Sequence, residues 1–266
     1  YYFAPSPENL KAAEKYSRNI FSVTRQLHFS SETLRLSLVL CIFLNGLPLI
    51  TLELKNKQTG TTSEDASAQY SSRPQSEKIF ASKRCLVHFA LDGDDVQMCT
   101  ELKGRASVFL PFNKGSNDGA GNPANPYGFN TSYLWEEILT RESLSDILEN
   151  YAYISSKDGA QIFPRWHQLH LVRSLLNDVK RDGVGKRYLV QHSAGSGKSN
   201  SIAWLARSLV GVKDRAGREI FDSVIIVNDR TQLDAQINET MNNIPSRSGL
   251  IGHAENSSGL GELLES

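Results

Sequence analysis

A short loop rich in glycine and serine ends in Lys198 and Ser199 and separates an apolar run from a helical pattern. Glycines allow backbone N–H groups to surround phosphate oxygens, and the N-terminus of the following helix adds positive potential. Lys198 can place its ammonium group beside the β- and γ-phosphates, and Ser199 can ligate Mg²⁺. This order predicts a nucleoside triphosphate site that takes ATP with Mg²⁺. The residues that would form the loop are Gly195, Ser196 and Gly197.

The loop departs from the P-loop pattern at one position, because His192 stands where the pattern has its first glycine. A non-glycine at that place is typical of superfamily 2 helicase-like motors. In those motors a glutamine ahead of the loop reads the adenine edge, since its amide is a paired donor and acceptor. Gln168 lies at a matching distance. The alternative is that Gln168 is a solvated helix residue.

The segment from 224 to 236 follows the predicted loop helix as the next strand and helix. Its place matches motif Ia of the same motors, which touches the nucleic-acid backbone. A buried strand with Asp229 as the N-cap of the next helix explains the residues equally well, and both interpretations stay open.

Glu53 and Lys55 form a second chemical candidate near the end of an apolar run. Residues two apart on a strand project to one face. A carboxylate beside a lysine on a strand next to a hairpin is half of a PD-(D/E)xK nuclease site. There the acid ligates Mg²⁺ and the lysine polarises the attacking water. Glu-x-Lys is a common spacing, and a solvated salt-bridge face is the alternative.

Composition is ordinary for a soluble globular protein, and 266 residues allow two domains. The longest apolar run is too short to cross a bilayer, so no membrane partner is expected. Net charge is zero, so any nucleic-acid surface must be local. The odd number of cysteines, without metal-ligand spacing, indicates a reduced, cytoplasmic compartment. Both ends of the chain look cut, and we expect a piece of something longer.

Short strands and turns are predicted between about residues 19 and 113. Asn45-Gly46 is a strong hairpin signal between apolar runs at 34–44 and 48–55, and Pro48 belongs at an edge or a bulge. A helix is expected over 62–70, and strands over 86–91, 96–102 and 107–112. The Gly/Asn/Pro-rich stretch at 113–128 indicates a loop at a domain boundary.

Helices are predicted over 132–151, with a break near Arg141, and over 166–180, 198–210 and 231–241. Strands are predicted over 186–191 and 222–228. Alternation of this kind predicts a parallel sheet wrapped by helices. We therefore expect an α/β protein in which a PD-(D/E)xK nuclease-like domain precedes the start of a RecA-like parallel-sheet motor domain. The expected divisions are 1–115 for the nuclease-like domain, 116–160 for a linker loop and helix, and 161–266 for the first ATPase lobe.

Several runs together resemble the R (restriction) subunit of type I restriction–modification enzymes. They are 19–27, 43–48, 53–56, 84–90, 109–115, 119–123, 133–137, 163–168, 191–202 and 229–236. The resemblance implies ATP-dependent translocation of double-stranded DNA and DNA cleavage. It also implies Glu53 and Lys55 as catalytic residues, Glu53 and Ser199 as metal ligands, and methyltransferase and specificity subunits as partners.

The chain departs from that pattern where the family has its metal-binding aspartate, because Val39 stands there. Valine cannot ligate a metal, so we expect weak Mg²⁺ binding and little or no DNA cleavage, with metal binding gained in Val39→Asp. Two other classes stay open. One is a stand-alone P-loop nucleotide-binding protein or kinase, whose lid could only be the stretch 211–218. The other is a non-enzymatic remnant that binds partners.

Overall fold

The computed structural model describes residues 1–3, 9–30, 32–33, 35–116, 119–214, 216–229, 231–243, 252–254 and 257–265. Residue contacts divide the chain into two compact units, Tyr1–His167 and Gln168–Ser266. The boundary expected at residue 115 thus lies inside the first unit. No described helix is both long and apolar enough to span a membrane.

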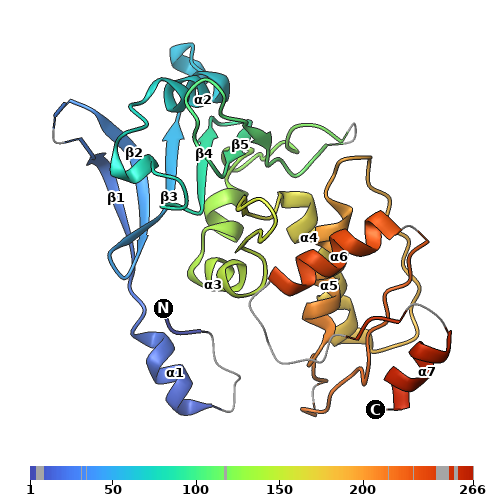
Figure 1. Ribbon diagram of the computed structural model, residues 1–266. Coiled ribbons are helices and arrows are strands. Elements are labelled where there is room, and N and C mark those ends of the chain that lie inside the picture. Colours follow the sequence, from blue (N-terminus) through green and yellow to red (C-terminus); the bar gives the residue numbers. More distant parts are fainter. Residues whose placement is uncertain are drawn as a thin grey trace. The chain divides into compact units, whose positions relative to one another are not determined.

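A six-stranded mixed sheet forms the centre of the first unit, in the order β1-β2-β3-β4-β5-β6 (Figure 1). Only β3 and β4 are parallel neighbours, and all other neighbours are antiparallel. Helix α2 (Ser63–Ser72) connects the two parallel strands and packs on them. The strands are β1 (Phe21–His28), β2 (Ser37–Leu44), β3 (Leu47–Leu54), β4 (Val87–Leu91), β5 (Val96–Cys99) and β6 (Leu110–Pro111).

The hairpin predicted at Asn45-Gly46 joins β2 and β3. Both turn residues have positive φ, 50° at Asn45 and 81° at Gly46, which is the backbone of a type I′ hairpin turn. The register shifts next to Phe43, which pairs with Pro48. Pro48 therefore lies at a bulge, as predicted.

Helices of the first unit follow the sequence signals at their ends. Thr62 and Asp65 form a capping box at the start of α2. The predicted helix over 132–151 is broken near Arg141: a π-helical segment, η3 (Leu134–Ile138), precedes α3 (Arg141–Asn150). The other elements of the unit are α1 (Leu10–Ser17), η1 (Lys57–Thr59), η2 (Lys78–Phe80), β7 (Tyr153–Ile154) and β8 (Gln161–Ile162).

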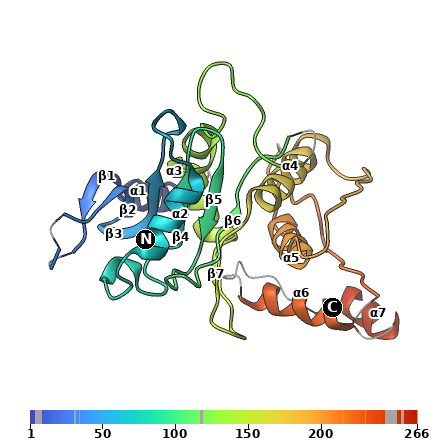
Figure 2. The ribbon, with the colours of Figure 1, turned by 90° about the horizontal axis from the view of Figure 1, so that it is seen from above.

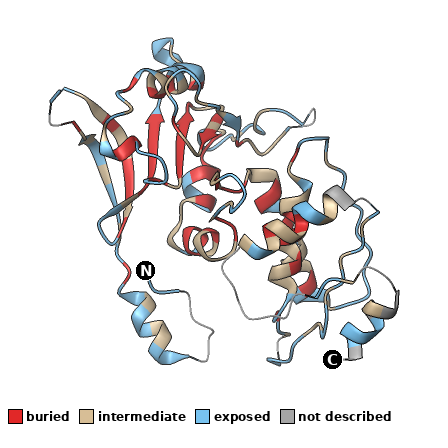
Figure 3. Cartoon of the chain, viewed as in Figure 1, coloured by how far each residue is buried: buried red, intermediate tan, exposed pale blue. Residues whose placement is uncertain are grey.

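The core of the first unit lies between α2 and the sheet. Figure 3 shows buried residues concentrated along β3 and β4. Tyr70 of α2 is fully buried there and contacts Phe80 and Phe109 edge-on and stacked, respectively. All three cysteines are free and buried, as small apolar residues are.

The loop that composition predicts to link domains is instead tied to the β4–β5 turn. Asn113 accepts a hydrogen bond from the N–H of Val96, and Asn122 donates to the carbonyl of Asp94. Asn130 donates to the Asp94 carboxylate. These contacts make the described part of the loop a member of the first unit.

Helices make up the second unit in the part of the chain that the structure describes. They are α4 (Trp166–Asp182), which starts in the first unit, α5 (Lys198–Leu209), α6 (Thr231–Asn243) and α7 (Ser257–Glu265). Helices α5 and α6 pack side by side (Figures 1 and 2). Helices predicted over 166–180, 198–210 and 231–241 are thereby confirmed.

The strands predicted over 186–191 and 222–228 are absent: both segments are described and neither has strand pairing. Leu189 is 96% exposed and Val227 is 87% exposed. A strand of a parallel sheet needs a hydrogen-bonded neighbour and cover on both faces, and neither segment has them here. The expectation of a RecA-like parallel sheet is therefore wrong for the described residues of this unit.

Candidate nucleotide site and nuclease-like centre

The loop between 192 and 197 leads directly into α5, whose first residue is Lys198. Gly195 and Gly197 have φ of +72° and +79°, a conformation that residues with a Cβ rarely adopt. The first turn of a helix has backbone N–H groups without intrahelical partners. The glycines therefore allow the chain to turn directly into the helix start, whose N–H groups are the kind of donor that phosphate binding uses.

Lys198 and Ser199 lie at this helix start with their polar atoms already engaged. The Lys198 Nζ atom donates to the carbonyls of His192, at 3.2 Å, and Ser193, at 2.8 Å. The ammonium group thus curls over the loop that precedes it. Ser199 Oγ donates to Oε1 of Gln236 in α6 at 3.1 Å. Both contacts are with neutral groups that an anionic ligand or a cation could displace.

Gln168 lies on α4, is 3% exposed and packs against the same loop. Its Nε2 donates to the carbonyls of Ser196, at 3.3 Å, and Gly197, at 2.9 Å. A Cβ built on Gly197 would clash with that nitrogen, so a side chain at position 197 would displace the Gln168 amide. The solvated-helix alternative for Gln168 is wrong, and the side chain holds the loop backbone.

Glu53 and Lys55, the predicted nuclease pair, are found at the end of β3 in different surroundings. Glu53 is completely buried, whereas Lys55 is half-buried and its Nζ donates to Oε1 of Gln69 in α2 at 2.5 Å. A solvated salt-bridge face is therefore wrong for Glu53. Burial raises the pKa of Glu53 above its ordinary value, and the nearby Arg73 charge partly offsets the rise.

Arg73, at the C-cap of α2, is the ionic partner of Glu53. Its Nη2 donates to Oε1 of Glu53 and, at 2.7 Å, to the carbonyl of Ser37. The guanidinium also lies over the ring of Phe29, 5.0 Å from its centroid. Sequence reasoning missed this residue, because a lone arginine after a helix gives no signal of the strand it will reach.

Val39 lies in β2, on the strand next to Glu53. The pairing of β2 with β3 extends to Leu40 and Leu52 and is not continued to Val39 and Glu53. Val39 is half-buried. The aliphatic residue that stands where the resemblance implies a second metal ligand is thus on the neighbouring strand, without a ladder pair to Glu53.

A buried polar chain lies on the neighbouring residues of β3 and β4. Thr51 Oγ1 lies 2.8 Å from the hydroxyl of Tyr70 and 2.7 Å from Nδ1 of His88. Burial lowers the pKa of His88 to about 3, so the imidazole is neutral at pH 7. Burial also raises the pKa of Tyr70 well above its ordinary value. None of these three hydrogen-bonded side chains is charged at neutral pH, and their contacts help to pack α2 on β3 and β4.

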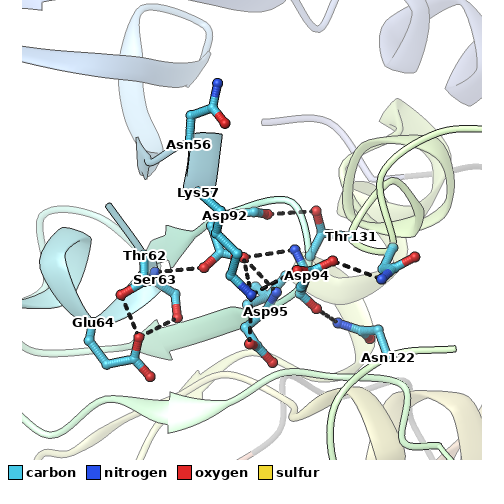
Figure 4. A network of polar contacts seen from close by, with 12 residues as sticks. Asn56, Lys57, Thr62, Ser63, Glu64, Asp92, Asp94, Asp95, Asn122 and Thr131 are labelled. Atoms are coloured by element: carbon cyan, nitrogen blue, oxygen red, sulfur yellow. Dashed lines mark hydrogen bonds and ion pairs between the residues drawn. The ribbon is translucent and has the colours of Figure 1, made fainter. Parts of the chain in front are cut away.

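Acidic residues gather at the β4–β5 turn, as Figure 4 shows. The buried Asp92 accepts hydrogen bonds from the N–H groups of Ser63, Asp94 and Asp95. Lys57 lies 2.7 Å from Asp94 and 3.7 Å from Asp92. The carboxylates of Asp92 and Asp94 thus already have hydrogen-bond and ion-pair partners within the protein. The described residues contain no group of three or more His, Cys, Asp or Glu side chains that could hold a metal ion.

Two family models match separate parts of the chain. A model described as the type I restriction enzyme R protein N terminus matches residues 8–107, and a SWI2/SNF2 ATPase model matches residues 167–266. The first match supports a relationship of this chain to the type I restriction enzyme R proteins, and the ATPase match that follows it fits that relationship. Val39, Glu53 and Arg73 lie within the R-protein match, and Gln168 and the Lys198 loop lie within the ATPase match. A comparison with curated proteins found no match.

Proposed function

We propose that this chain is part of a type I restriction enzyme R protein, binds ATP with Mg²⁺ at the loop from 192 to 199 and uses it to translocate double-stranded DNA. It would work beside methyltransferase and specificity subunits, which recognise the DNA site. The observation that carries the proposal is the loop geometry: two glycines at positive φ lead into a helix that starts with Lys198 and Ser199. The ATPase-like match over the same residues supports it.

The residues of the loop fit a nucleoside triphosphate. Lys198 would face the β- and γ-phosphates, the N–H groups at the start of α5 would donate to phosphate oxygens, and Ser199 would ligate Mg²⁺. When bound, Mg²⁺ neutralises charge on the phosphates. The contacts of Lys198 with two carbonyls hold its charge at the loop before any ligand enters.

A stand-alone kinase receives no support from the stretch 211–218. There Asp214 accepts hydrogen bonds from the N–H groups of Ala216 and Arg218, and its carboxylate pairs with the Arg218 guanidinium at 2.9 Å. An isolated bridge joins Lys213 to Glu219. The described part of the stretch is a closed turn, and Arg218 is engaged within it. Arg215 lies outside the described residues.

Nucleotide selectivity tests the proposal. The parent chain should bind Mg·ATP and prefer it to Mg·GTP, because the Gln168 amide, once it exchanges its contacts with the Ser196 and Gly197 carbonyls for the base, matches the adenine edge as donor and acceptor. Gln168→Ala should remove the preference. The substitution should also weaken the binding of both nucleotides several-fold, because the hydrogen bonds from Nε2 to the Ser196 and Gly197 carbonyls are lost. Equilibrium titration with both nucleotides measures each effect, and His170→Ala, on the exposed side of α4, is the control.

A parent chain that binds neither nucleotide would contradict the proposed function. If the parent binds ATP and GTP equally and Gln168→Ala weakens the binding of both to the same extent, Gln168 holds the loop in place and does not read the base.

A further inference from the structure

The ion pair between Glu53 and Arg73 lies where a nuclease of this type would hold its metal ion. The two side chains are 0% and 4% exposed. Glu53 comes from β3, and Arg73 reaches it from the end of α2, with the Ser37 carbonyl as its second acceptor. The pair therefore joins α2, β2 and β3 inside the core.

The ligand set around Glu53 does not fit Mg²⁺. This cation takes octahedral oxygen ligands and gives up its water reluctantly, so it needs carboxylates. Val39, on the neighbouring strand β2, is aliphatic where the resemblance implies a second carboxylate, and the described residues hold no suitable cluster of metal-ligating side chains. One carboxylate that is already paired with a cation offers a divalent ion too little negative charge.

Arginine is well suited to take the place of the ion. Its guanidinium stays charged and offers N–H donors along one edge that match the two oxygens of a carboxylate. Arg73 Nε and Glu53 Oε2 are both buried and lack a hydrogen-bond partner among the described residues. A hydrogen bond between these two atoms would complete a two-bond fork beside the existing Nη2–Oε1 contact.

We propose that Arg73 is the resident cation of this centre, so that the first unit keeps Glu53 charged and in place without binding a divalent metal. The proposal goes beyond the proposed function, which concerns the nucleotide loop, and takes the first unit to be a nuclease-like domain. It also changes the expectation for Val39→Asp: restoring the carboxylate alone is insufficient, because Arg73 pairs with the restored charge as well.

Manganese binding to the nucleotide-free full chain tests the proposal, with electron paramagnetic resonance reporting free Mn²⁺. The parent, Val39→Asp and Arg73→Gln should show no Glu53-dependent Mn²⁺ site with a Kd below about 1 mM. Protein sites for hard cations at the weak end of their range have dissociation constants of about this size. The double variant Val39→Asp/Arg73→Gln should bind one Mn²⁺ at least about tenfold more tightly. Adding Glu53→Gln to the double variant is the matched control and should abolish that site.

The double variant places two carboxylates together without a cation and can lose its fold when metal is absent. In that case Mn²⁺ should restore the circular dichroism of the parent, because metal binding then supplies folding free energy. Two results would overturn the proposal. One is Glu53-dependent Mn²⁺ binding by the parent or by Val39→Asp alone. The other is a double variant that neither binds Mn²⁺ nor refolds with it. Neither depends on ATP binding, so failure of the proposed function is seen separately.

Discussion

Glu53→Gln is expected to lower the free energy of unfolding of the first unit by about 3–5 kcal/mol, because it leaves the Arg73 guanidinium buried and uncompensated. Both side chains are almost completely inaccessible to water. The double variant Glu53→Leu/Arg73→Met should recover most of the loss, since apolar residues of similar volume commonly replace a buried ion pair without cost. Urea unfolding at pH 7, followed by far-ultraviolet circular dichroism, gives both values.

Glu101→Gln is the control for this experiment, because it breaks the exposed pair between Glu101 and Lys103 and should change unfolding little. A Glu53→Gln variant as stable as the parent would show that the pair with Arg73 does not exist in solution. A double variant no more stable than Glu53→Gln would show that the loss comes from packing rather than from an unpaired charge.

His88 should make the first unit sensitive to acid. Its folded pKa is lowered to about 3, from an ordinary value of 6.5, because the ring is buried. The folded state therefore binds fewer protons than the unfolded state between these values. The stability from neutral His88 is present above pH 6.5 and is lost as pH falls toward 3, by about 1.4 kcal/mol per pH unit.

By pH 4 the loss should amount to about 3 kcal/mol relative to His88→Gln, whose side chain does not titrate. Chemical unfolding of both chains at several pH values measures the difference, in which the contributions of carboxylates common to both cancel. Parallel pH profiles for the two chains would mean that the ring is accessible to water and protons in the folded state.

The fold of the first unit could be predicted where local chemistry decides it. Asn45-Gly46 fixes the hairpin because both residues tolerate positive φ, and the Thr62–Asp65 capping box starts α2. The described part of the segment 113–128 is a loop, as its Gly/Asn/Pro composition indicates, but composition does not say whether side chains anchor such a loop. Its asparagines bind the β4–β5 turn across a long sequence separation, which composition does not reveal.

In the second unit, local sequence patterns predicted the helices correctly but not the strands. Apolar runs at 186–191 and 222–228 have the composition of buried parallel strands, but a strand forms only with a neighbour to complete its ladder. The helices α4, α5 and α6 need no such partner and follow their sequence signals. Prediction was therefore better for elements whose hydrogen bonds are internal.

The candidate sites divide in the same way. Lys198 and Ser199 could be found from adjacent residues, because loop and helix start are contiguous in the chain. The contact of Gln168 with the loop and the contact of Arg73 with Glu53 join separate elements, and no spacing rule links their positions. For Glu53 the sequence indicated a strand face, but only tertiary packing decided that it is buried.

Titration of Mg·ATP against the parent and Lys198→Ala tests the central claim most directly, with Lys180→Ala, exposed on α4, as the control. Hydrogen bonds to charged groups are worth about 1.5–3 kcal/mol, so Lys198→Ala should weaken binding about 10- to 100-fold. Circular dichroism should stay unchanged, because within the described part of the chain the Lys198 ammonium donates to the loop carbonyls of His192 and Ser193 and to no core residue. Lys180→Ala should bind like the parent. Equal affinity of Lys198→Ala and the parent would contradict the assignment of this loop as the nucleotide site.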